Sequence, residues 1–490
     1  MNEGPERARS DLLSERRAKL ERLREAGIEP YPHGFPDRTE IAAVREAHEG
    51  IEPGEETNDR YRIAGRLVAR RGHGKASFLD LKDGTGQIQV QARVDELGDA
   101  YEGLLSLDIG DIVGIEGTCF ASRRGELSIR ADAWELLSKS LRPPPEKFHG
   151  LEDLETRYRR RELDLMANEQ TRDLFLKRAR TIAAVRRWFD SRGFIEVETP
   201  VLQPLYGGAL ARPFTTHHNA LDRDLYLRIA TELYLKRLIV GGIDKVYELG
   251  KDFRNEGISH KHNPEFTMLE WYEAYADYND TASELEGLVS TVAQEVLGTT
   301  KIEREGETID LAPPWRRVTL RDAIEKRTGI DVREHPSREQ LAEAMGSEPD
   351  PEEGWGKLVD GLLSKEVEPT LIQPTFVVDY PVELSPFAKR HRTEEGLVER
   401  WEAFVGGIEI SNSFTELNDP DEQRRRFEAQ AEETARGDEE TQPYDETFVD
   451  SLEQGMPPTG GAGLGIDRLV MILTGAKTLR EVVLFPAMRS

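Results

Sequence analysis

The sequence contains very little cysteine and no long apolar stretch. Its single cysteine, Cys119, excludes an internal disulfide and any zinc cluster built on cysteine, and it fits a reducing cytoplasm. No apolar run approaches the length needed to span a bilayer. The first residues, MNEGPERARSDLL, lack a basic region followed by an apolar core. We therefore predict no signal peptide, no membrane contact and a cytoplasmic location.

Positive charge is also scarce. The 490 residues include 66 Lys and Arg against 93 Asp and Glu, which gives a formal net charge of −27. This balance argues against indiscriminate nucleic-acid binding, which depends on basic side chains that neutralise phosphates, but it leaves room for a local basic face. A hydrophobic content of 37% and a charged content of 32% are typical of a globular protein, and the length predicts two or three domains.

The N-terminal segment 1–58 is predicted to be a helical arm. Residues 6–26 are rich in Arg and Glu, and Gly27 ends the helical pattern. One interpretation is an arm that contacts RNA through its basic side chains, and the other is a solvated helix with mixed ion pairs. The basic residues concerned are Arg16, Arg17, Lys19, Arg22 and Arg24.

Residues 59–142 form short apolar runs separated by turn signals, as a small barrel requires. Five such strands, with an amphipathic stretch between the third and fourth, predict an OB-fold, whose strand face binds oligonucleotides. Residues 60–142 hold thirteen Lys and Arg and twelve Asp and Glu, so this segment does not share the acidity of the whole chain. Phe78 and Gln89 could stack on and read a base, with Arg70, Arg71 and Lys75 nearby. The alternative for a single phenylalanine in a strand is a core position.

The most informative stretch is KVYELGKDFRNEGISHKHNPEFTMLEWYEA, residues 245–274. It predicts two strands joined by a loop at residues 257–263, and residues of like parity on a strand share one face. One surface of this hairpin would then hold a cation, two carboxylates, a ring and a phenol, from Arg254, Glu256, Phe266, Glu270 and Tyr272. Burying such a set without a partner is costly, so a ligand is one explanation and a solvated hairpin face is the other.

A second hairpin follows in ERWEAFVGGIEISNSFTEL, where Gly406 and Gly407 predict a two-residue turn. Around that turn Phe404 opposes Glu409, and Glu402 shares the face of Phe404. Glu402 and Glu409 therefore lie diagonally across one face, within reach of a shared cation. Because no basic partner is obvious, the two carboxylates suit Mg²⁺, which takes oxygen ligands and substrate phosphates. The alternative is two solvated glutamates.

The glycine-rich segment GGAGLGIDRLVM, residues 460–471, is not a P-loop, because it lacks the Gly-Lys-Ser/Thr ending, and its spacing misses the dinucleotide fingerprint. It predicts a strand followed by a helix, with Arg468 at the junction, where an arginine can bind phosphate with a bidentate fork. Upstream, RIATELYLKRL places Glu232 at the start of a helix, and Gly207 and Gly208 allow a backbone to approach a ligand closely.

Several of these stretches resemble one known family. FRNEGISHKHNPEFT, with its Phe-Arg-x-Glu core, resembles motif 2 of class II aminoacyl-tRNA synthetases, in the form found in bacterial lysyl-tRNA synthetases. The helix predicted over 171–192, followed by GFIEVETP, resembles motif 1, which builds a homodimer interface, and GGAGLGIDRLVM resembles motif 3. Residues 59–142 resemble the anticodon-binding domain of class IIb synthetases.

The resemblance implies a fold and an activity. We expect an α+β protein with an N-terminal five-stranded OB-fold barrel at 59–142, a linker at 143–170 and a class II catalytic domain at 171–490. That domain would be an antiparallel sheet flanked by helices, with a helical insertion near 315–370. The implied activity is ATP-dependent activation of L-lysine to lysyl-adenylate and transfer of the lysyl group to the 3′ end of tRNA(Lys). A homodimer with Mg²⁺ as cofactor would perform it.

The same resemblance implies a role for each matching position. The catalytic residues would be Arg254 and Arg468. The lysine-binding residues would be Gly208, Glu232, Arg254, Glu270, Tyr272, Asn412, Phe414 and Glu416. The ATP-binding residues would be Arg254, Glu256, His262, Asn263, Phe266, Glu402, Gly463 and Arg468, and the Mg²⁺ ligands Glu402 and Glu409. The anticodon contacts would be Arg70, Phe78, Gln89 and Glu126.

Placing all these residues in one site requires an irregular strand. Strict alternation would put Asn412, Phe414 and Glu416 on the face opposite Glu409, whereas the resemblance puts all of them in one site. A β-bulge inserts one extra residue and so changes which face the following residues occupy. We therefore predict a bulge near residues 411–413.

Three alternatives remain open. An aspartyl- or asparaginyl-type class IIb synthetase shares the architecture but should offer cationic or amide groups to the side chain instead of a carboxylate pair. A lysyltransferase that acts on a protein should lack the barrel. A non-catalytic tRNA-binding paralogue should have lost Arg254, Arg468 or the glutamate pair, and all of these are present in the sequence.

Overall fold

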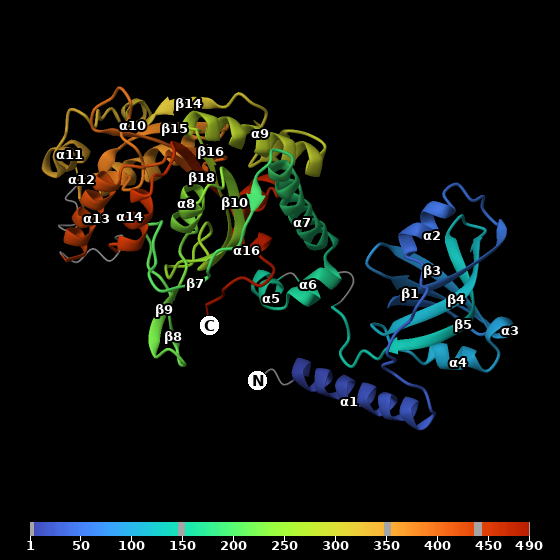
Figure 1. Cartoon of the computed structure of the whole chain (residues 1–490). Helices are drawn as coiled ribbons and strands as arrows, with labels where there is room; N and C mark the ends of the chain where they lie inside the picture. Colours follow the sequence, from blue (N-terminus) through green and yellow to red (C-terminus); the bar gives the residue numbers. More distant parts are fainter. Residues whose placement is uncertain (1–3, 146–150, 152, 347–353, 436–442, 490) are drawn as a thin grey trace. The chain divides into compact units, whose positions relative to one another are not determined.

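The computed structural model describes residues 4–145, 151, 153–346, 354–435 and 443–489 (Figure 1). The chain divides into two compact units, Met1–Leu151 and Glu152–Ser490, and each is described by itself. The division falls inside the predicted linker 143–170. However, α5 (Leu154–Arg159) and α6 (Arg161–Ala167), which follow it, already lie in the second unit.

The first unit contains a closed five-stranded barrel with strand order β1-β2-β3-β5-β4. Two short helices, α3 (Val94–Leu97) and α4 (Ala100–Leu105), lie between the third and fourth strands, so the predicted OB-fold and its insertion are confirmed. The strands are β1 (Glu56–His73), β2 (Ala76–Lys82), β3 (Gln87–Arg93), β4 (Ile112–Ala121) and β5 (Leu127–Ser138). Apolar side chains that alternate along them, such as Ile88 and Val90, fill the barrel core.

The N-terminal arm packs against this barrel. It consists of α1 (Gly4–Glu25) and α2 (Ile41–Ala47), and Leu20 of α1 is buried. Arg16 donates to the backbone carbonyls of Ser140 at 3.0 Å and Ile109 at 3.1 Å. Lys19 forms a 2.5 Å ion pair with Asp108. Arg16 and Lys19 therefore hold the helix on the barrel, so neither the RNA-contact interpretation nor the solvated-helix interpretation describes these two side chains.

The second unit is built on an eight-stranded sheet with order β14-β15-β16-β17-β18-β11-β10-β6. Neighbouring strands are antiparallel except for the parallel pairs β14–β15 and β10–β6 at the two edges. The strands are β6 (Ile195–Glu196), β10 (Lys245–Phe253), β11 (Glu265–Ala274), β14 (Arg316–Thr319), β15 (Thr375–Pro381), β16 (Leu397–Val405), β17 (Ile408–Thr415) and β18 (Thr459–Gly465). This sheet, flanked by helices, confirms the α+β class.

Helices cover the two faces of this sheet differently. On one face, α7 (Glu169–Asp190), α9 (Tyr278–Leu297) and α15 (Ile466–Thr474) bury a large apolar core that contains Trp271 and Trp401. On the other face, α8 (Glu232–Val240) packs over β10 and β11, and α14 (Glu446–Glu453) packs on α8, around a smaller core that contains Tyr272. The central strands of that second face are left open to a cavity.

Residues 320–346 and 354–370 form a mostly helical segment at the position of the predicted insertion, and its apolar core also includes Val377, Val398 and Phe404 of β15 and β16. It contains α10 (Leu320–Thr328), α11 (Arg338–Met345), α12 (Trp355–Leu362), the π-helix η1 (Leu363–Val367) and the 3-10 helix η2 (Glu368–Thr370). The remaining elements are β7 (Leu202–Gln203), β8 (Thr215–His218), β9 (Arg223–Leu227), β12 (Lys301–Arg304), β13 (Glu307–Asp310), η3 (Val382–Leu384), α13 (Pro420–Ala435) and α16 (Leu479–Val482).

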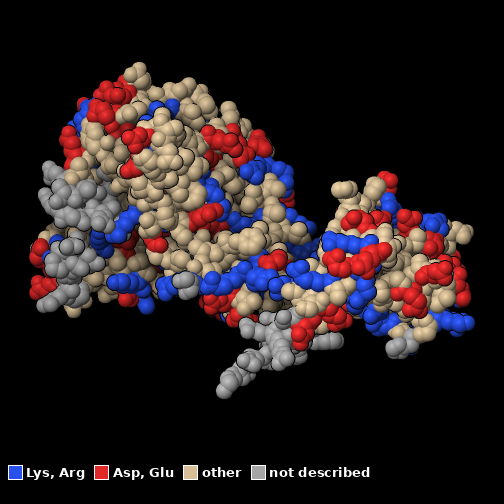
Figure 2. Space-filling model, turned by 90° about the horizontal axis from the view of Figure 1, so that it is seen from below, with Lys and Arg blue, Asp and Glu red and all other residues tan. Residues whose placement is uncertain are grey.

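The surface is not uniformly acidic despite the net charge of −27. Lys and Arg side chains are interspersed with Asp and Glu on the face shown in Figure 2. Within the described part of the chain, no helix combines the length and the apolar character needed to cross a bilayer.

Candidate active site

A cavity of about 660 Å³ opens over the central strands of the second unit. Its walls come from β11, β16, β17 and β18, from the loop before α8 and from the loop between β10 and β11. All of the candidate residues that the sequence names in this unit line it: Gly208, Glu232, Arg254, Glu256, His262, Asn263, Phe266, Glu270, Tyr272, Glu402, Glu409, Asn412, Phe414, Glu416, Gly463 and Arg468. Segments more than 250 residues apart in the sequence therefore meet in one cavity.

The first predicted hairpin is β10–β11. Its register pairs Glu248 with Glu270 and Asp252 with Phe266, and residues 254–264 form the loop. Along β11, Leu269 and Trp271 enter the core beneath α7 and α9. The alternate residues Phe266, Met268, Glu270 and Tyr272 line the cavity, as strand periodicity requires.

The second hairpin, β16–β17, contains the predicted bulge at a slightly different place. Phe404 pairs with Glu409 and Ala403 with Ser411, so the extra residue is Ile410, which precedes the predicted 411–413. Beyond the bulge Glu402 lies directly opposite Asn412. The bulge thus brings Glu402, Glu409 and Asn412 to the same cavity.

Glycines of β18 keep the cavity open. This strand lies between β17 and β11, with Gly463 opposite Asn412 on one side and Glu270 on the other. A Cβ atom built on Gly461 would lie 2.1 Å from Glu416 Oε1, and one built on Gly463 would lie 2.7 Å from the Met268 methyl group. Any larger residue at these positions would therefore fill the space between the two hairpins.

One end of the cavity is lined with buried carboxyl groups. Glu232 begins α8, Glu416 follows β17, and Glu270 lies on β11; all three are at most 6% exposed. The backbone N–H of Thr231 donates to Glu270 at 3.2 Å, and the Tyr272 hydroxyl donates to it at 3.4 Å. This end combines the carboxylates that the sequence predicted with a cation that it did not single out.

That cation is Lys236, one helical turn after Glu232. Its Nζ donates to Glu232 Oε1 at 2.6 Å and forms an ion pair with Glu416. The spacing of four residues on α8 was the available signal, because such pairs face each other on a helix. Glu232 and Glu416 therefore already share one ammonium group in the ligand-free protein.

The carboxyl-lined end retains an excess of acid. Burial, and after it the nearby charges of Asp252 and Glu232, raise the pKa of Glu270 to about 8. Burial also raises the pKa of Glu416 to about 8, despite the opposing effect of Lys236. Glu270 and Glu416, with their raised pKa values, favour a cationic ligand, because an added ammonium would stabilise their ionised forms.

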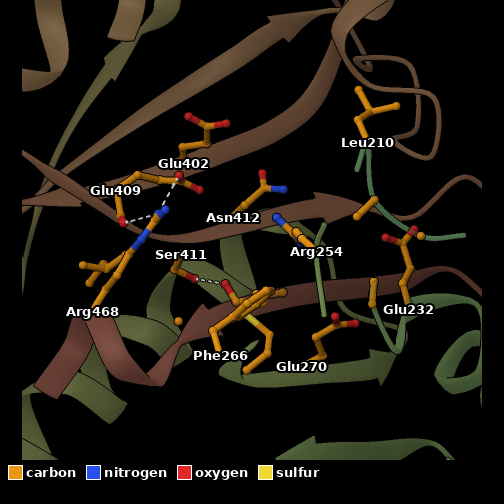
Figure 3. Close-up of a pocket in the computed structure, with 18 of the residues that line it drawn as sticks. Leu210, Glu232, Arg254, Phe266, Glu270, Glu402, Glu409, Ser411, Asn412 and Arg468 are labelled. Carbon is orange, nitrogen blue, oxygen red and sulfur yellow. Dashed lines mark hydrogen bonds and ion pairs between the residues drawn. The ribbon is translucent and has the colours of Figure 1, made fainter. Parts of the chain in front are cut away.

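The other end of the cavity is lined with arginine. The guanidinium of Arg468 donates to the backbone carbonyl of Glu409 at 2.7 Å and to its carboxylate at 2.9 Å. Arg254 lies between this pair and the Glu232–Glu270 end, with its guanidinium 5.1 Å from the ring centroid of Phe266 (Figure 3). Burial, then the charges of Arg468 and Lys261, lower the pKa of His262 to about 4, so this imidazole is neutral at pH 7.

The two proposed metal ligands have basic partners, contrary to the argument made from the sequence. Arg400 donates to Glu402 at 2.5 Å, and Arg468 pairs with Glu409. Burial raises the pKa of Glu402 to about 7. At Glu409 burial acts in the same direction, but the charge and hydrogen bond of Arg468 and the charges of Arg400 and Arg254 together outweigh it, and the pKa is lowered. No cluster of three or more His, Cys, Asp or Glu that could hold a metal occurs among the described residues.

The donor set nevertheless fits one kind of cation. Mg²⁺ is commonly bound by one or two carboxylates together with substrate phosphates, so Glu402 and Glu409 are sufficient where a triphosphate supplies the remaining oxygens. The arginines now on these carboxylates would bind the phosphates instead. Arg400 lies two positions from Glu402 on β16, and residues two apart on a strand share one face, so strand parity was the signal for this ion pair.

On the barrel, three of the four predicted anticodon contacts lie on or beside one strand face. Phe78 is half-buried and lies opposite Arg71 on one side and Gln91 on the other. Gln89 accepts a hydrogen bond from Ser128 at 3.1 Å, and the exposed Glu126 is two residues from that serine.

Arg70 points elsewhere. It pairs with the core residue Leu79, and its guanidinium donates to the carbonyls of Leu105 and Leu107. Its neighbour Arg71 is the basic residue beside Phe78, where it binds Asp80 at 2.9 Å. Strand parity could have made this distinction, because adjacent residues face opposite sides.

Two family models match the chain. Residues 61–137 match the OB-fold nucleic acid binding domain, and residues 153–489 match the tRNA synthetases class II (D, K and N). The lysine–tRNA ligase of Moorella thermoacetica is 53% identical over 98% of both chains. The chain belongs to the lysine–tRNA ligase family of class II synthetases.

Other members of the lysine–tRNA ligase family match over the same length. The lysine–tRNA ligase of Pelotomaculum thermopropionicum is 52% identical over 99% of this chain and 96% of its own. That of Bacillus subtilis is 50% identical over 98% and 97%, respectively. The match therefore includes both the barrel and the unit that holds the cavity.

Proposed function

We propose that the protein activates L-lysine with ATP to form lysyl-adenylate and transfers the lysyl group to the 3′ end of tRNA(Lys). The observation that carries this proposal is the two-ended cavity. One end holds Glu232, Glu270 and Glu416, which suit ammonium groups, and the other holds Arg468, which suits phosphate. Arg254 lies between them, where the carboxylate of the amino acid would meet the α-phosphate (Figure 3).

Each end of lysine has a suitable partner. Glu232, beside Gly208, would bind the α-ammonium, and Glu416 with Tyr272 would bind the side-chain ammonium. The carboxylate would lie on Arg254, assisted by Asn412, and Glu270 and Phe414 would complete the wall. A buried ammonium must be paired with acid, so these contacts favour lysine over neutral or acidic amino acids.

ATP would occupy the rest of the cavity. Phe266 would stack on the adenine and Glu256 would accept from its amino group, with His262, Asn263 and Gly463 lining the space. Arg254 would bind the α-phosphate and Arg468 the γ-phosphate. Glu402 and Glu409 would hold Mg²⁺, which when bound neutralises phosphate charge.

The chemistry needs no protein nucleophile. A carboxylate oxygen of lysine attacks the α-phosphorus, a bond forms between them, and the bond to the bridging oxygen breaks as pyrophosphate leaves. A terminal ribose hydroxyl of tRNA then attacks the lysyl carbonyl and AMP leaves. The side chains of the cavity align these partners and stabilise the charge that develops on the phosphate oxygens.

The barrel would bind the anticodon. Phe78 would stack on a base, and Gln89 and Glu126 would read base edges. Arg70 supports the adjoining loop through its two carbonyl contacts, so we assign the electrostatic contact to Arg71 instead.

A homodimer is supported by apolar side chains exposed on and after α7. Leu176 on α7, Ile195 on β6 and Leu202 on β7 are 49%, 53% and 48% exposed. Sedimentation velocity should show a dimer, and Ile195→Asp should shift it towards monomer. Leu221→Asp, at an equally exposed leucine between β8 and β9, is the matched control and should remain dimeric. A native monomer at micromolar concentration would contradict the proposal.

The decisive experiment is amino-acid-dependent exchange between pyrophosphate and ATP by the purified protein. Exchange that requires lysine and Mg²⁺ supports the proposal. Exchange with aspartate or asparagine would assign the protein to another class IIb specificity, and no exchange with any amino acid would leave only tRNA binding.

A further inference from the structure

The carboxyl-lined end of the cavity contains a cation that has no role in the proposed reaction. Lys236 is fully buried on α8. Its Nζ is bound to both Glu232 and Glu416. The remaining side of the ammonium is closed by rings, with the Phe387 centroid at 5.1 Å and the Phe448 centroid at 6.0 Å. Acid and aromatic faces therefore surround this charge.

The local charges do not balance around Lys236. A buried ion pair is tolerated when opposite charges match, but here one ammonium faces Glu232, Glu416 and, nearby, Glu270. With all three carboxyls ionised, this end would have two negative charges in excess. The two ammonium groups of one bound lysine would supply the missing charge, and its carboxylate would be neutralised by Arg254.

Lys236 also links two parts of the fold that approach the cavity separately. Glu232 lies in the first turn of α8, and Glu416 follows β17, where its backbone N–H donates to Thr459 at 2.8 Å. A glutamate side chain has several rotatable bonds, so its carboxylate is mobile unless something holds it. One ammonium bound to both side chains fixes one oxygen of each.

The remaining oxygen of Glu416 faces the substrate space. Within the described residues, Glu416 Oε1 has no hydrogen-bond partner. It lies beside Gly461, where an added Cβ would come within 2.1 Å of it. Glu416 is fully buried from solvent, but it lines the cavity, and the absence of a side chain at Gly461 leaves space between this oxygen and the ring of Tyr272.

We propose that Lys236 is a positioning residue that fixes the separation of Glu232 and Glu416, and thereby the distance between the two ammonium groups that the cavity accepts. This inference rests on the proposed activation of lysine. Lys236 would then determine selectivity, because a diamino acid of different length cannot pair with the carboxylates of Glu232 and Glu416 at the same time.

The test compares lysine with ornithine, whose side chain is one methylene shorter, in pyrophosphate exchange. Lys236→Met removes the charge and keeps much of the volume. We expect the lysine KM to rise about tenfold or more, and the kcat/KM ratio of lysine over ornithine to fall about tenfold, as Glu416 is released. The ATP KM should change less than about twofold. An unchanged lysine-to-ornithine ratio would overturn the proposal.

Lys245→Met is the matched control. Lys245 is 38% exposed, forms a 2.6 Å ion pair with Glu273 and does not line the cavity. Its replacement should leave both KM values and the selectivity ratio unchanged. A comparable loss of selectivity in this variant would show that the effect of Lys236 is not local.

A second variant covers the case in which Lys236→Met does not fold, as judged by circular dichroism and thermal unfolding. Lys236→Arg keeps the positive charge but places a longer, planar group between the two glutamates. Positioning predicts a several-fold change in the lysine-to-ornithine ratio, whereas a role in charge balance alone predicts no change and would refute the inference. Absence of lysine-dependent exchange by the unaltered protein would instead refute the proposed function.

Discussion

The cavity of the second unit and the strand face of the barrel present their charges in opposite ways. In the cavity, Glu232, Glu270 and Glu416 are buried in excess of their one cation, Lys236. On the barrel, ion pairs such as Arg60 with Asp132 are exposed to solvent. Buried charge interacts strongly because water does not screen it, whereas exposed pairs contribute little.

This difference matches two kinds of ligand. A small dication can be desolvated completely, so its binding depends on a few buried partners. A polyanionic RNA strand stays largely in water, so its binding depends on stacking and on many weak, screened contacts. Substitutions in the cavity should therefore alter pyrophosphate exchange, which needs no tRNA, and substitutions on the barrel should alter only tRNA charging.

The largest expected effect is the loss of Arg254. Its guanidinium lies between the two ends of the cavity, where substrate carboxylate and α-phosphate would meet. Arg254→Ala should lower kcat/KM for exchange about a hundredfold or more, because a charge that stabilises the transition state is removed. Arg321→Ala is the control, since Arg321 pairs with Asp331 outside the cavity. Equal activity of the two variants would show that Arg254 does not contribute to exchange and would contradict the role given to the cavity.

The next effect concerns the acid that receives the side chain. Glu416→Gln removes a buried carboxylate, so the side-chain ammonium of bound lysine loses its counter-ion. The lysine KM should rise about thirtyfold or more, while the ATP KM stays within about twofold. Exposed Glu428 offers a matched Glu→Gln control. A similar rise in the lysine KM and the ATP KM would show that Glu416 supports the structure of the whole cavity and does not bind lysine specifically.

On the barrel, Phe78→Ala should raise the tRNA KM in charging about tenfold, because base stacking on an aromatic ring is lost. Pyrophosphate exchange should not change. Tyr31→Ala replaces an exposed ring of the same unit, one whose hydroxyl donates to the carbonyl of Lys139, and should leave the tRNA KM near its original value. A defect of Phe78→Ala in exchange without tRNA would contradict the separation of the two units.

The smallest expected effect is a dependence of lysine binding on pH. Glu270 and Glu416 hold protons up to about pH 8 in the ligand-free protein, and a bound ammonium favours their ionised forms. Lysine affinity should therefore rise a few-fold between about pH 6 and pH 8, with release of protons on binding. The other titratable groups at this end are Glu232, Lys236, Asp252 and Tyr272.

Calorimetric titration in two buffers of different ionisation enthalpy measures this proton release, and Glu270→Gln should reduce it.

The same pKa shifts have a consequence for stability. The folded protein keeps these protons where the unfolded chain, with an ordinary glutamate pKa of 4.5, has released them. The free energy of unfolding without ligand should thus fall as the pH rises from about 4.5 to about 8. Proton uptake on lysine binding would contradict the expected proton release, and a free energy of unfolding that does not fall over this pH range would contradict the expected change in stability.

Local patterns in the sequence were sufficient for some parts of this structure. Alternation along β11 predicted that Phe266, Glu270 and Tyr272 share a face, because strand periodicity is a local property. The bulge on β17 was predicted from the need to bring Asn412 to the same cavity as Glu409, but its position moved to Ile410. Where a strand takes in an extra residue depends on the partners on both sides, which local sequence does not specify.

Charge partners were the least predictable feature. The absence of an obvious cation near Glu402 and Glu409 suggested a metal, yet Arg400 and Arg468 pair with them. Arg468 is 59 residues from Glu409 in the sequence. Only the order of strands in the sheet brings them together, because β17 and the end of β18 are neighbours there.

The sequence by itself determined the barrel, the two hairpins and which residues carry charge into the second unit, because periodicity, turn chemistry and motif spacing act over short distances. The tertiary structure alone decided that Lys236 would be enclosed by Glu232 and Glu416. It also decided that Arg468 would pair with Glu409, which lies 59 residues away in the sequence. Both outcomes depend on how distant segments pack, because a charge that packing buries is costly unless an opposite charge lies next to it.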